Sequence, residues 1–113
     1  MPPKKRFTRK EYEDAWNLLT IDLDSLKSNY GSVKNLLPES SVLYAVMKSD
    51  AYGHGIVEVG CALSAAGCGH FAVETPHEGV TLRNEGITGE ILVMNPVPTW
   101  MSELCVKHGL SVS

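Results

Sequence analysis

A lysine, a tyrosine and two glycines lie close together in AVMKSDAYGHG, residues 45–55. Lys48 follows directly after an apolar run, and a lysine is seldom buried without a partner. Removal from water lowers the pKa of a lysine and makes its free amine available for Schiff-base chemistry. Tyr52, four residues on, could hydrogen-bond a ligand group held near that amine. These residue types favour a covalent ligand site at Lys48.

The glycines suit the same purpose. Gly53 and Gly55 would let the backbone come close to a ligand and lead into the next helix, whose N-terminus could help to hold a phosphate. The plainer alternative is a lysine that reaches water at a strand end, which is common. The residues alone leave both possibilities open.

Other binding patterns are incomplete here. The third glycine of a GxGxxG fingerprint is missing, which argues against a dinucleotide loop, and the absence of GxxxxGK[ST] excludes a P-loop. His54 and Glu58 are four residues apart and could share a helix face with a metal ion, but further ligands are lacking. The three cysteines show no CxxC spacing, so we expect no metal site, and reduced cysteines fit a cytoplasmic protein.

Composition is typical of one soluble globular domain, with 43% hydrophobic and 20% charged residues. The sequence has no run of about 18 apolar residues, so we expect no membrane span. No apolar signal region follows the N-terminal charges, which argues against secretion.

Charge is unevenly distributed. Residues 1–10 contain five of the 10 basic residues, while the other 103 residues contain five basic and 13 acidic ones. A basic head could bind nucleic acid or a membrane surface, but a solvated, frayed terminus is the plainer interpretation. The acidic remainder argues against nucleic acid as the main partner.

From residue 19 onward, strand-like and helix-like patterns alternate. We expect strands over 19–23, 42–47, 70–74, 91–94 and 110–113, and helices over 25–37, 55–67, 76–86 and 99–109. The run over 42–47 is apolar throughout and predicts a strand buried on both faces. Thr75, Pro76 and Glu78 predict a capping box at the start of the third helix.

Parallel strands need helical crossovers, so the alternation predicts an α/β fold with a parallel sheet. Chemistry in such folds gathers at the carboxyl ends of the strands, where Lys48 is expected. A complete (β/α)₈ barrel needs about 250 residues, and this chain has 113, with a strand-like segment at its last residue. We therefore expect a polar lead-in over 1–18 and, over 19–113, the N-terminal portion of a larger α/β protein.

The same residues resemble a known family. AVMKSDAYGHG is similar to the cofactor-lysine signature of alanine racemases, usually written AVVKADAYGHG. TIDLDSLKSNYGSVKNLLP resembles that family's opening strand and helix, and FAVETPHEGVTLRNEGITGEILVMNP resembles its next two βα units. The resemblance covers nearly the whole chain from residue 19.

The resemblance implies a pyridoxal 5′-phosphate enzyme built on a TIM-type (β/α)₈ barrel of fold type III. Lys48 would form a Schiff base with the cofactor and then act as acid and base on one face of the substrate α-carbon. Tyr52 would bind the cofactor phosphate, and Met94 would stand beside the cofactor ring. Glu78 and Arg83 match recurrent family positions, which we interpret as capping and helix-face residues.

The resemblance also implies what this segment does not contain. The family's second catalytic residue is a tyrosine from the partner subunit, located in a later β domain, which implies a homodimer with shared active sites. The arginine that contacts the cofactor ring lies further along the barrel than Arg83. We therefore expect the full-length protein to interconvert L- and D-alanine. The alternatives are a serine or broad-specificity racemase and a non-catalytic cofactor-binding barrel fragment.

Overall fold

A computed structural model describes residues 11, 13 and 16–113 of the chain, so most of the predicted lead-in over 1–18 lies outside the described residues. The elements are α2 (Leu23–Leu36), β1 (Ala45–Val46), α3 (Lys48–Tyr52), α4 (Ile56–Ala65), β2 (His70–Val73), α5 (Pro76–Asn84), β3 (Glu90–Val93), the 3₁₀ helix η1 (Thr99–Met101), α6 (Ser102–Lys107) and β4 (Ser111–Val112). None of the helices in this described part is both long and apolar enough to cross a bilayer.

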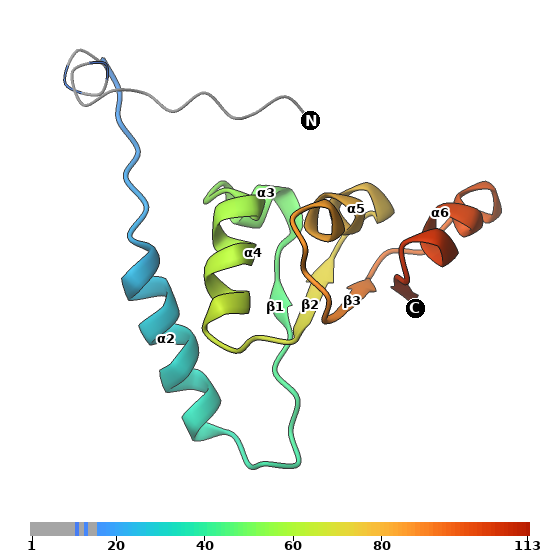
Figure 1. The fold of residues 1–113 in the computed structure, drawn as a ribbon, viewed down its shortest axis with the longest axis horizontal. Coiled ribbons are helices and arrows are strands. Elements are labelled where there is room, and N and C mark those ends of the chain that lie inside the picture. The colour runs from blue at the N-terminus through green and yellow to red at the C-terminus, as the bar shows by residue number, and fades with distance from the viewer. Residues whose placement is uncertain (1–10, 12, 14–15) are drawn as a thin grey trace.

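The four strands form one parallel sheet in the order β1-β2-β3-β4. Each strand therefore lies beside the next one in the sequence, and the order never reverses as it does in a doubly wound fold. Right-handed crossovers with this order place the connecting helices on one face of the sheet, and Figure 1 shows the strands side by side with α4 and α5 among the connections. The arrangement confirms the predicted α/β fold and is that of the N-terminal part of a TIM-type barrel.

The core lies between the sheet and the helices. Phe71 and Val73 of β2 and Ile91 and Val93 of β3 are fully buried, and they alternate along each strand with residues that face the other side. Leu82 brings α5 onto the same core. On the same face of the sheet, α4 contributes the buried residues Ile56, Val59 and Leu63. Helix α2 packs beside α4 through the partly buried residues Leu23, Leu26 and Tyr30.

The strand expected over 19–23 is not present. Residues 16–22, which precede α2, form no strand, Leu19 is 75% exposed, and the helix begins at Leu23. The physical reason is local: the Asp22 carboxylate accepts hydrogen bonds from the Ser25 backbone N–H at 3.1 Å and from its hydroxyl at 2.8 Å. Asp22 is thus the N-cap, and it starts the helix two residues before the expected range of 25–37.

The prediction for 42–47 is also wrong in part. Only Ala45 and Val46 pair with β2, Val42 is 57% exposed, and Val46 is 39% exposed, whereas Met47 is almost completely buried. β1 has a strand on one side only within the described sheet, so its apolar run is not covered on both faces. The pattern identified the strand but overstated its burial.

The capping box is confirmed. The Thr75 hydroxyl accepts a hydrogen bond from the Glu78 backbone N–H, while the Glu78 carboxylate accepts one from the Thr75 N–H, and Pro76 occupies the first turn. The helix expected over 55–67 begins one residue later and ends two residues earlier, and the helix expected over 76–86 ends two residues earlier. The helix expected over 99–109 is divided into η1 and α6.

Candidate cofactor site at the carboxyl end of the sheet

Lys48 lies immediately after β1, at the carboxyl end of the strand, as the sequence predicted. Its side chain is half-buried. Among residues 11, 13 and 16–113, its amine makes no hydrogen bond or ion pair, and a half-buried amine of this kind is open to a ligand. The strand end therefore presents an unpaired primary amine at the edge where parallel α/β folds place their chemistry.

The turn after Lys48 is left-handed. Ser49, Asp50, Ala51 and Tyr52 have φ angles of 54°, 56°, 54° and 55°, although none of them is glycine. A left-handed conformation costs an L-residue roughly 1–2 kcal/mol because its Cβ approaches the following carbonyl oxygen. Backbone strain of this kind persists only where neighbouring contacts enforce it. We expected backbone freedom only at the glycines, and no pattern in the sequence indicated this turn.

Local contacts hold one side of the turn. Ala51 donates to the Met47 carbonyl at 2.9 Å and buries its methyl group in the core, with 6% exposure. The Asp50 carboxylate accepts from the backbone N–H of Ile56 at 2.8 Å, which connects the turn to the first residue of α4. His54 places Nδ1 3.1 Å from the Ala51 carbonyl oxygen, a structural contact beside the loop.

The side chain of Glu78, from α5, holds the other side of the left-handed turn. Oε2 of Glu78, in the first turn of α5, accepts from the backbone N–H of Ser49 at 3.0 Å. Oε1 of the same carboxylate accepts from the N–H groups of Glu74 and Thr75, each at 3.0 Å. The capping role of Glu78 was predicted from the sequence, but its contact with Ser49 was not, because a pair 29 residues apart leaves no local spacing signal.

The other two predicted site residues lie at the same end of the sheet. Tyr52 ends the left-handed turn with 60% of its side chain exposed, and its hydroxyl has no partner within the described chain. Met94 follows β3 and is half-buried; its N–H donates to the Val73 carbonyl and its own carbonyl accepts from the Ser113 hydroxyl. Met94 is thus two strands away from Lys48 in the sheet order.

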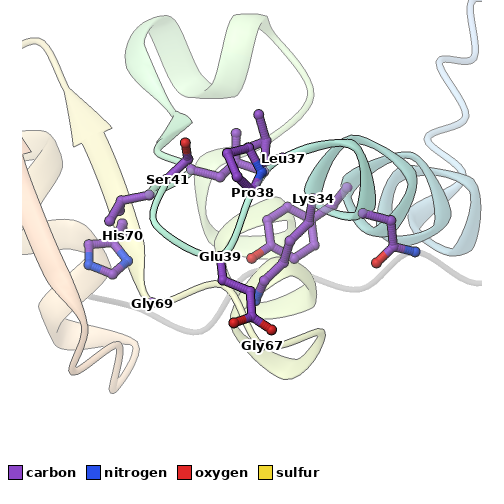
Figure 2. A pocket seen from close by; sticks show the side chains of 12 residues that line it. Lys34, Leu37, Pro38, Glu39, Ser41, Gly67, Gly69 and His70 are labelled. Atoms are coloured by element: carbon purple, nitrogen blue, oxygen red, sulfur yellow. The ribbon is translucent and has the colours of Figure 1, made fainter.

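The amino ends of the strands hold a cavity of about 540 Å³, shown in Figure 2. The end of α2, the following loop and the start of β2 line it, through Tyr30, Lys34, Glu39 and His70 among others. None of the predicted site residues lines this cavity. Because residues at this end of a parallel barrel usually serve stability, we place the chemistry at Lys48 and not here.

The polar groups at these amino ends satisfy one another. Arg83 donates from Nε to the carbonyl of His108 at 2.8 Å, from Nη1 to those of Ile87 and Gly89 at 2.7 Å each, and from Nη2 to that of Gly109 at 3.0 Å. One guanidinium therefore ties the end of α5 to the loops that precede β3 and β4. Arg83, interpreted from sequence as a helix-face residue, is the anchor of these loops.

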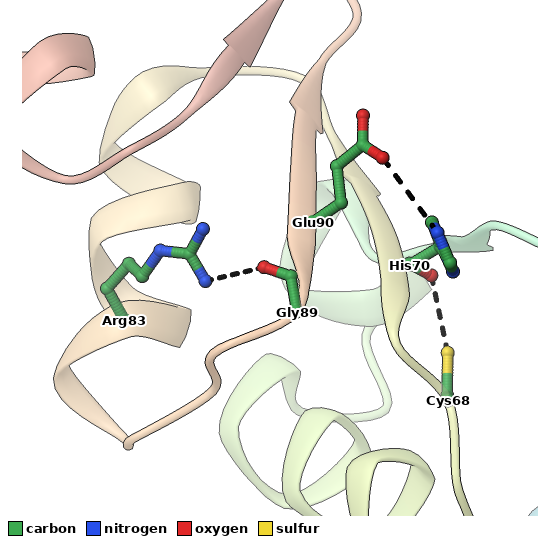
Figure 3. A network of polar contacts seen from close by, with 5 residues as sticks. All are labelled: Cys68, His70, Arg83, Gly89 and Glu90. Carbon is green, nitrogen blue, oxygen red and sulfur yellow. Dashed lines mark hydrogen bonds and ion pairs between the residues drawn. The ribbon is translucent and has the colours of Figure 1, made fainter.

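A second group of contacts joins the first residues of β2 and β3. His70 Nε2 lies 3.9 Å from a Glu90 carboxylate oxygen, and the Cys68 thiol donates to the His70 carbonyl at 3.3 Å (Figure 3). The Glu90 carboxylate also hydrogen-bonds the Tyr44 hydroxyl, and this contact raises the pKa of Tyr44. Nowhere in the described part of the chain do three His, Cys, Asp or Glu residues cluster as metal ligands would.

Known proteins share both the sequence and the fold. The family model for the N-terminal domain of alanine racemase matches residues 21–113. Alanine racemase of Halothermothrix orenii is 38% identical over 106 residues, which is 94% of this chain and 26% of that protein. The chain thus spans about a quarter of the length of the curated relatives it matches.

Solved structures agree with the sequence match. Alanine racemase of Clostridium difficile 630 superposes with a TM-score of 0.75 at 39% identity, over 80% of this chain and 24% of that one. Alanine racemase of Bartonella henselae, solved with covalently bound pyridoxal phosphate, gives 0.72 at 25% identity, over 81% and 26%. These matches show that the chain belongs to the alanine racemase N-terminal domain family.

Proposed function

We propose that residues 19–113 are the cofactor-lysine part of a pyridoxal 5′-phosphate-dependent alanine racemase, preceded by a polar lead-in over 1–18. The observation that carries the proposal is Lys48: an amine without a partner in the described chain, at the carboxyl end of β1 and inside the family's signature stretch. The racemisation of L- and D-alanine belongs to the longer protein, because the relatives are about four times as long as this chain.

The donor set suits the cofactor. A primary amine condenses with an aldehyde and releases water, and Lys48 offers such an amine. A phenol donates a hydrogen bond to a phosphate oxygen, and the exposed Tyr52 hydroxyl lies four residues further in the same turn. At Gly53 a side chain would meet nothing within 4 Å, so the space beside Tyr52 is open. We assign Lys48 and Tyr52 to cofactor binding, and Met94 to the apolar wall beside the ring.

The chain's own residues would do three things. Lys48 Nζ would hold the cofactor and, on one face of the substrate, carry a proton to or from the α-carbon. Tyr52 would orient the cofactor through its phosphate, and the left-handed turn would fix the separation of these two groups. Pyridoxal phosphate, when bound, supplies the electron sink that makes removal of an α-proton possible.

The substrate and partners follow from the family assignment. We propose a small amino acid, alanine, as substrate, and a homodimer in which the partner subunit supplies the group for the opposite face. Serine or a broader set of amino acids is the alternative, since this segment contains few of the residues that would contact the substrate. The free cysteines are consistent with the cytoplasm, which we propose as the location.

The first experiment tests the cofactor lysine. The longest natural chain that contains this sequence is incubated with pyridoxal phosphate and reduced with borohydride, and the modified peptide is mapped by mass spectrometry. We expect one pyridoxyl adduct, on Lys48. Adducts scattered over other lysines, with none on Lys48, would refute the assignment.

A second experiment separates an enzyme from a non-catalytic cofactor-binding barrel fragment. Alanine and serine are each incubated with the loaded protein in heavy water, and incorporation of deuterium at the α-carbon is followed by NMR. A racemase exchanges the α-proton, and the preferred amino acid identifies the substrate. Attachment to Lys48 without exchange of either amino acid would favour the non-catalytic alternative.

A further inference from the structure

The left-handed turn is the part of the site that its own sequence does not enforce. Four non-glycine residues in succession have positive φ angles, and they connect the lysine to the tyrosine that are proposed to bind the two ends of one cofactor. A right-handed relaxation anywhere in residues 49–52 would change the distance and direction between Lys48 and Tyr52. The contacts that prevent this relaxation therefore control the geometry of the site.

Among the side-chain hydrogen bonds of the described residues, the one between Ser49 and Glu78 alone joins the turn to another βα unit. Oε2 of Glu78 accepts the Ser49 N–H at 3.0 Å, and Ser49 is the residue directly after the lysine. Glu78 as a residue is half-buried, while its hydrogen bond to Ser49 is exposed to water. A helix cap requires only the contact with Thr75, so the bond to Ser49 serves some other purpose.

The two oxygens of the carboxylate divide these roles. Oε1 receives the N–H groups of Glu74 and Thr75 and the Thr75 hydroxyl, which are all contacts at the start of α5. Oε2 receives Ser49 alone. One side chain thus holds the beginning of α5 with one oxygen and the turn after β1 with the other, and it fixes the two neighbouring strand ends relative to each other.

We propose that Glu78 is a positioning residue for the cofactor site: through Ser49 it holds the left-handed turn so that Lys48 and Tyr52 can engage the aldehyde and the phosphate of one molecule together. This inference rests on the proposed function. It assigns to a helix-capping residue a role in binding a phosphorylated aldehyde, and Glu78 itself touches neither group.

The decisive variant is Glu78→Gln in the longest natural chain that contains this sequence. The amide oxygen can still accept from Glu74 and Thr75, but the amide nitrogen then faces the Ser49 N–H, so two donors oppose each other. The cap is kept while the contact with the turn is lost. Thr75→Ala is the matched control, because it removes the hydroxyl of the capping box and leaves the contact with Ser49 intact.

The readout compares pyridoxal phosphate with pyridoxal, which lacks the phosphate. In the parent protein the phosphate should tighten binding strongly, because Lys48 and Tyr52 act on one molecule. We expect Glu78→Gln to weaken binding of pyridoxal phosphate about 10-fold and to change pyridoxal binding little, since the loss of a hydrogen bond to a charged acceptor is worth about one such factor. Thr75→Ala should lower the melting temperature without changing the ratio of the two affinities.

The outcomes are separable from those of the proposed function. If the parent protein forms no adduct on Lys48, the function is wrong and this inference falls with it. If the parent forms the adduct and Glu78→Gln keeps the same preference for the phosphate, only the inference is overturned. Should Glu78→Gln fail to fold, hydrogen exchange of the Ser49 amide in the parent protein decides the question.

An independent measurement needs no variant. Hydrogen exchange of the Ser49 amide in the cofactor-free parent protein should be slowed to about the rate of the amides in α5, because this amide donates a hydrogen bond to the Glu78 carboxylate. Exchange of the Ser49 amide at the rate of an open loop would overturn the proposal whatever the variants show.

Discussion

At the amino ends of the strands, Arg83 places its N–H groups on four backbone carbonyls, and His70, Glu90 and Cys68 pair with nearby groups. At the carboxyl end of β1, the Lys48 amine and the Tyr52 hydroxyl have no partner in the described chain, and the backbone between them is strained. Satisfied polar groups stabilise one conformation, whereas unsatisfied ones are available to a ligand. The same sheet thus has its polar groups paired at one edge, and we propose that the other edge binds the cofactor.

The largest effect should come from Lys48→Arg. The substitution keeps the positive charge, but a guanidinium does not condense with an aldehyde as an amine does, so the adduct on this peptide should disappear completely. Lys34→Arg, at the cavity on the opposite edge, is the matched control and should leave the adduct unchanged. Borohydride reduction followed by peptide mapping measures both. An adduct that survives Lys48→Arg at the parent's level would contradict the division between the two edges.

Arg83→Lys should instead affect stability. Lysine has a single nitrogen in place of the fork that reaches four carbonyls, and the unpaired carbonyls should lower the free energy of unfolding by about 2–3 kcal/mol. Urea unfolding measures the change, and Lys107→Arg on the exposed side of α6 is the reverse substitution, for which we expect almost none. The Lys48 adduct should persist under native conditions. Loss of the adduct in a folded Arg83→Lys protein would show that the two edges are coupled.

Gly89→Ala tests how tightly the strands approach at the amino edge. A Cβ on Gly89 would collide with the backbone carbonyl of Gly69, whose oxygen accepts the Glu90 N–H at 2.8 Å and cannot move aside easily. We expect a loss of about 2 kcal/mol in the free energy of unfolding. Gly31→Ala is the matched control, because nothing lies within 4 Å of its Cβ, and in the middle of α2 it should stabilise by about 0.5–1 kcal/mol. Equal changes in the free energy of unfolding for the two substitutions would mean that the backbone of Gly69 can move away from a side chain at residue 89.

The smallest effect concerns alkaline pH. The Glu90 carboxylate raises the pKa of Tyr44 by hydrogen bonding to its neutral hydroxyl, and burial adds to this. A raised pKa contributes stability that is fully present below the pKa of an unfolded tyrosine, about 10, and is lost as the pH rises through the higher folded value. Tyr44→Phe and Glu90→Gln should each flatten the fall in melting temperature above that pH. A fall as steep as the parent's would show that this contact does not contribute.

Much of the fold was predictable because its signals are local. The strand–helix alternation gave the parallel sheet, and Thr75, Pro76 and Glu78 gave the start of α5, because a capping box is completed within four residues. The position of Lys48 followed from an apolar run that ends at a charge. The strand over 19–23 was predicted wrongly because an alternating pattern cannot show whether a strand has a neighbour to pair with.

The sequence by itself determined the order of the elements, the lysine at the end of β1 and the family signature around it. Only the tertiary structure decided that residues 49–52 turn left-handed, since four L-residues do not choose that conformation without outside contacts. It also decided that Glu78 reaches Ser49 and that Arg83 reaches the carbonyls of two loops. These contacts join residues that are more than 20 positions apart, and their partners are backbone groups, which every residue carries and no sequence pattern distinguishes.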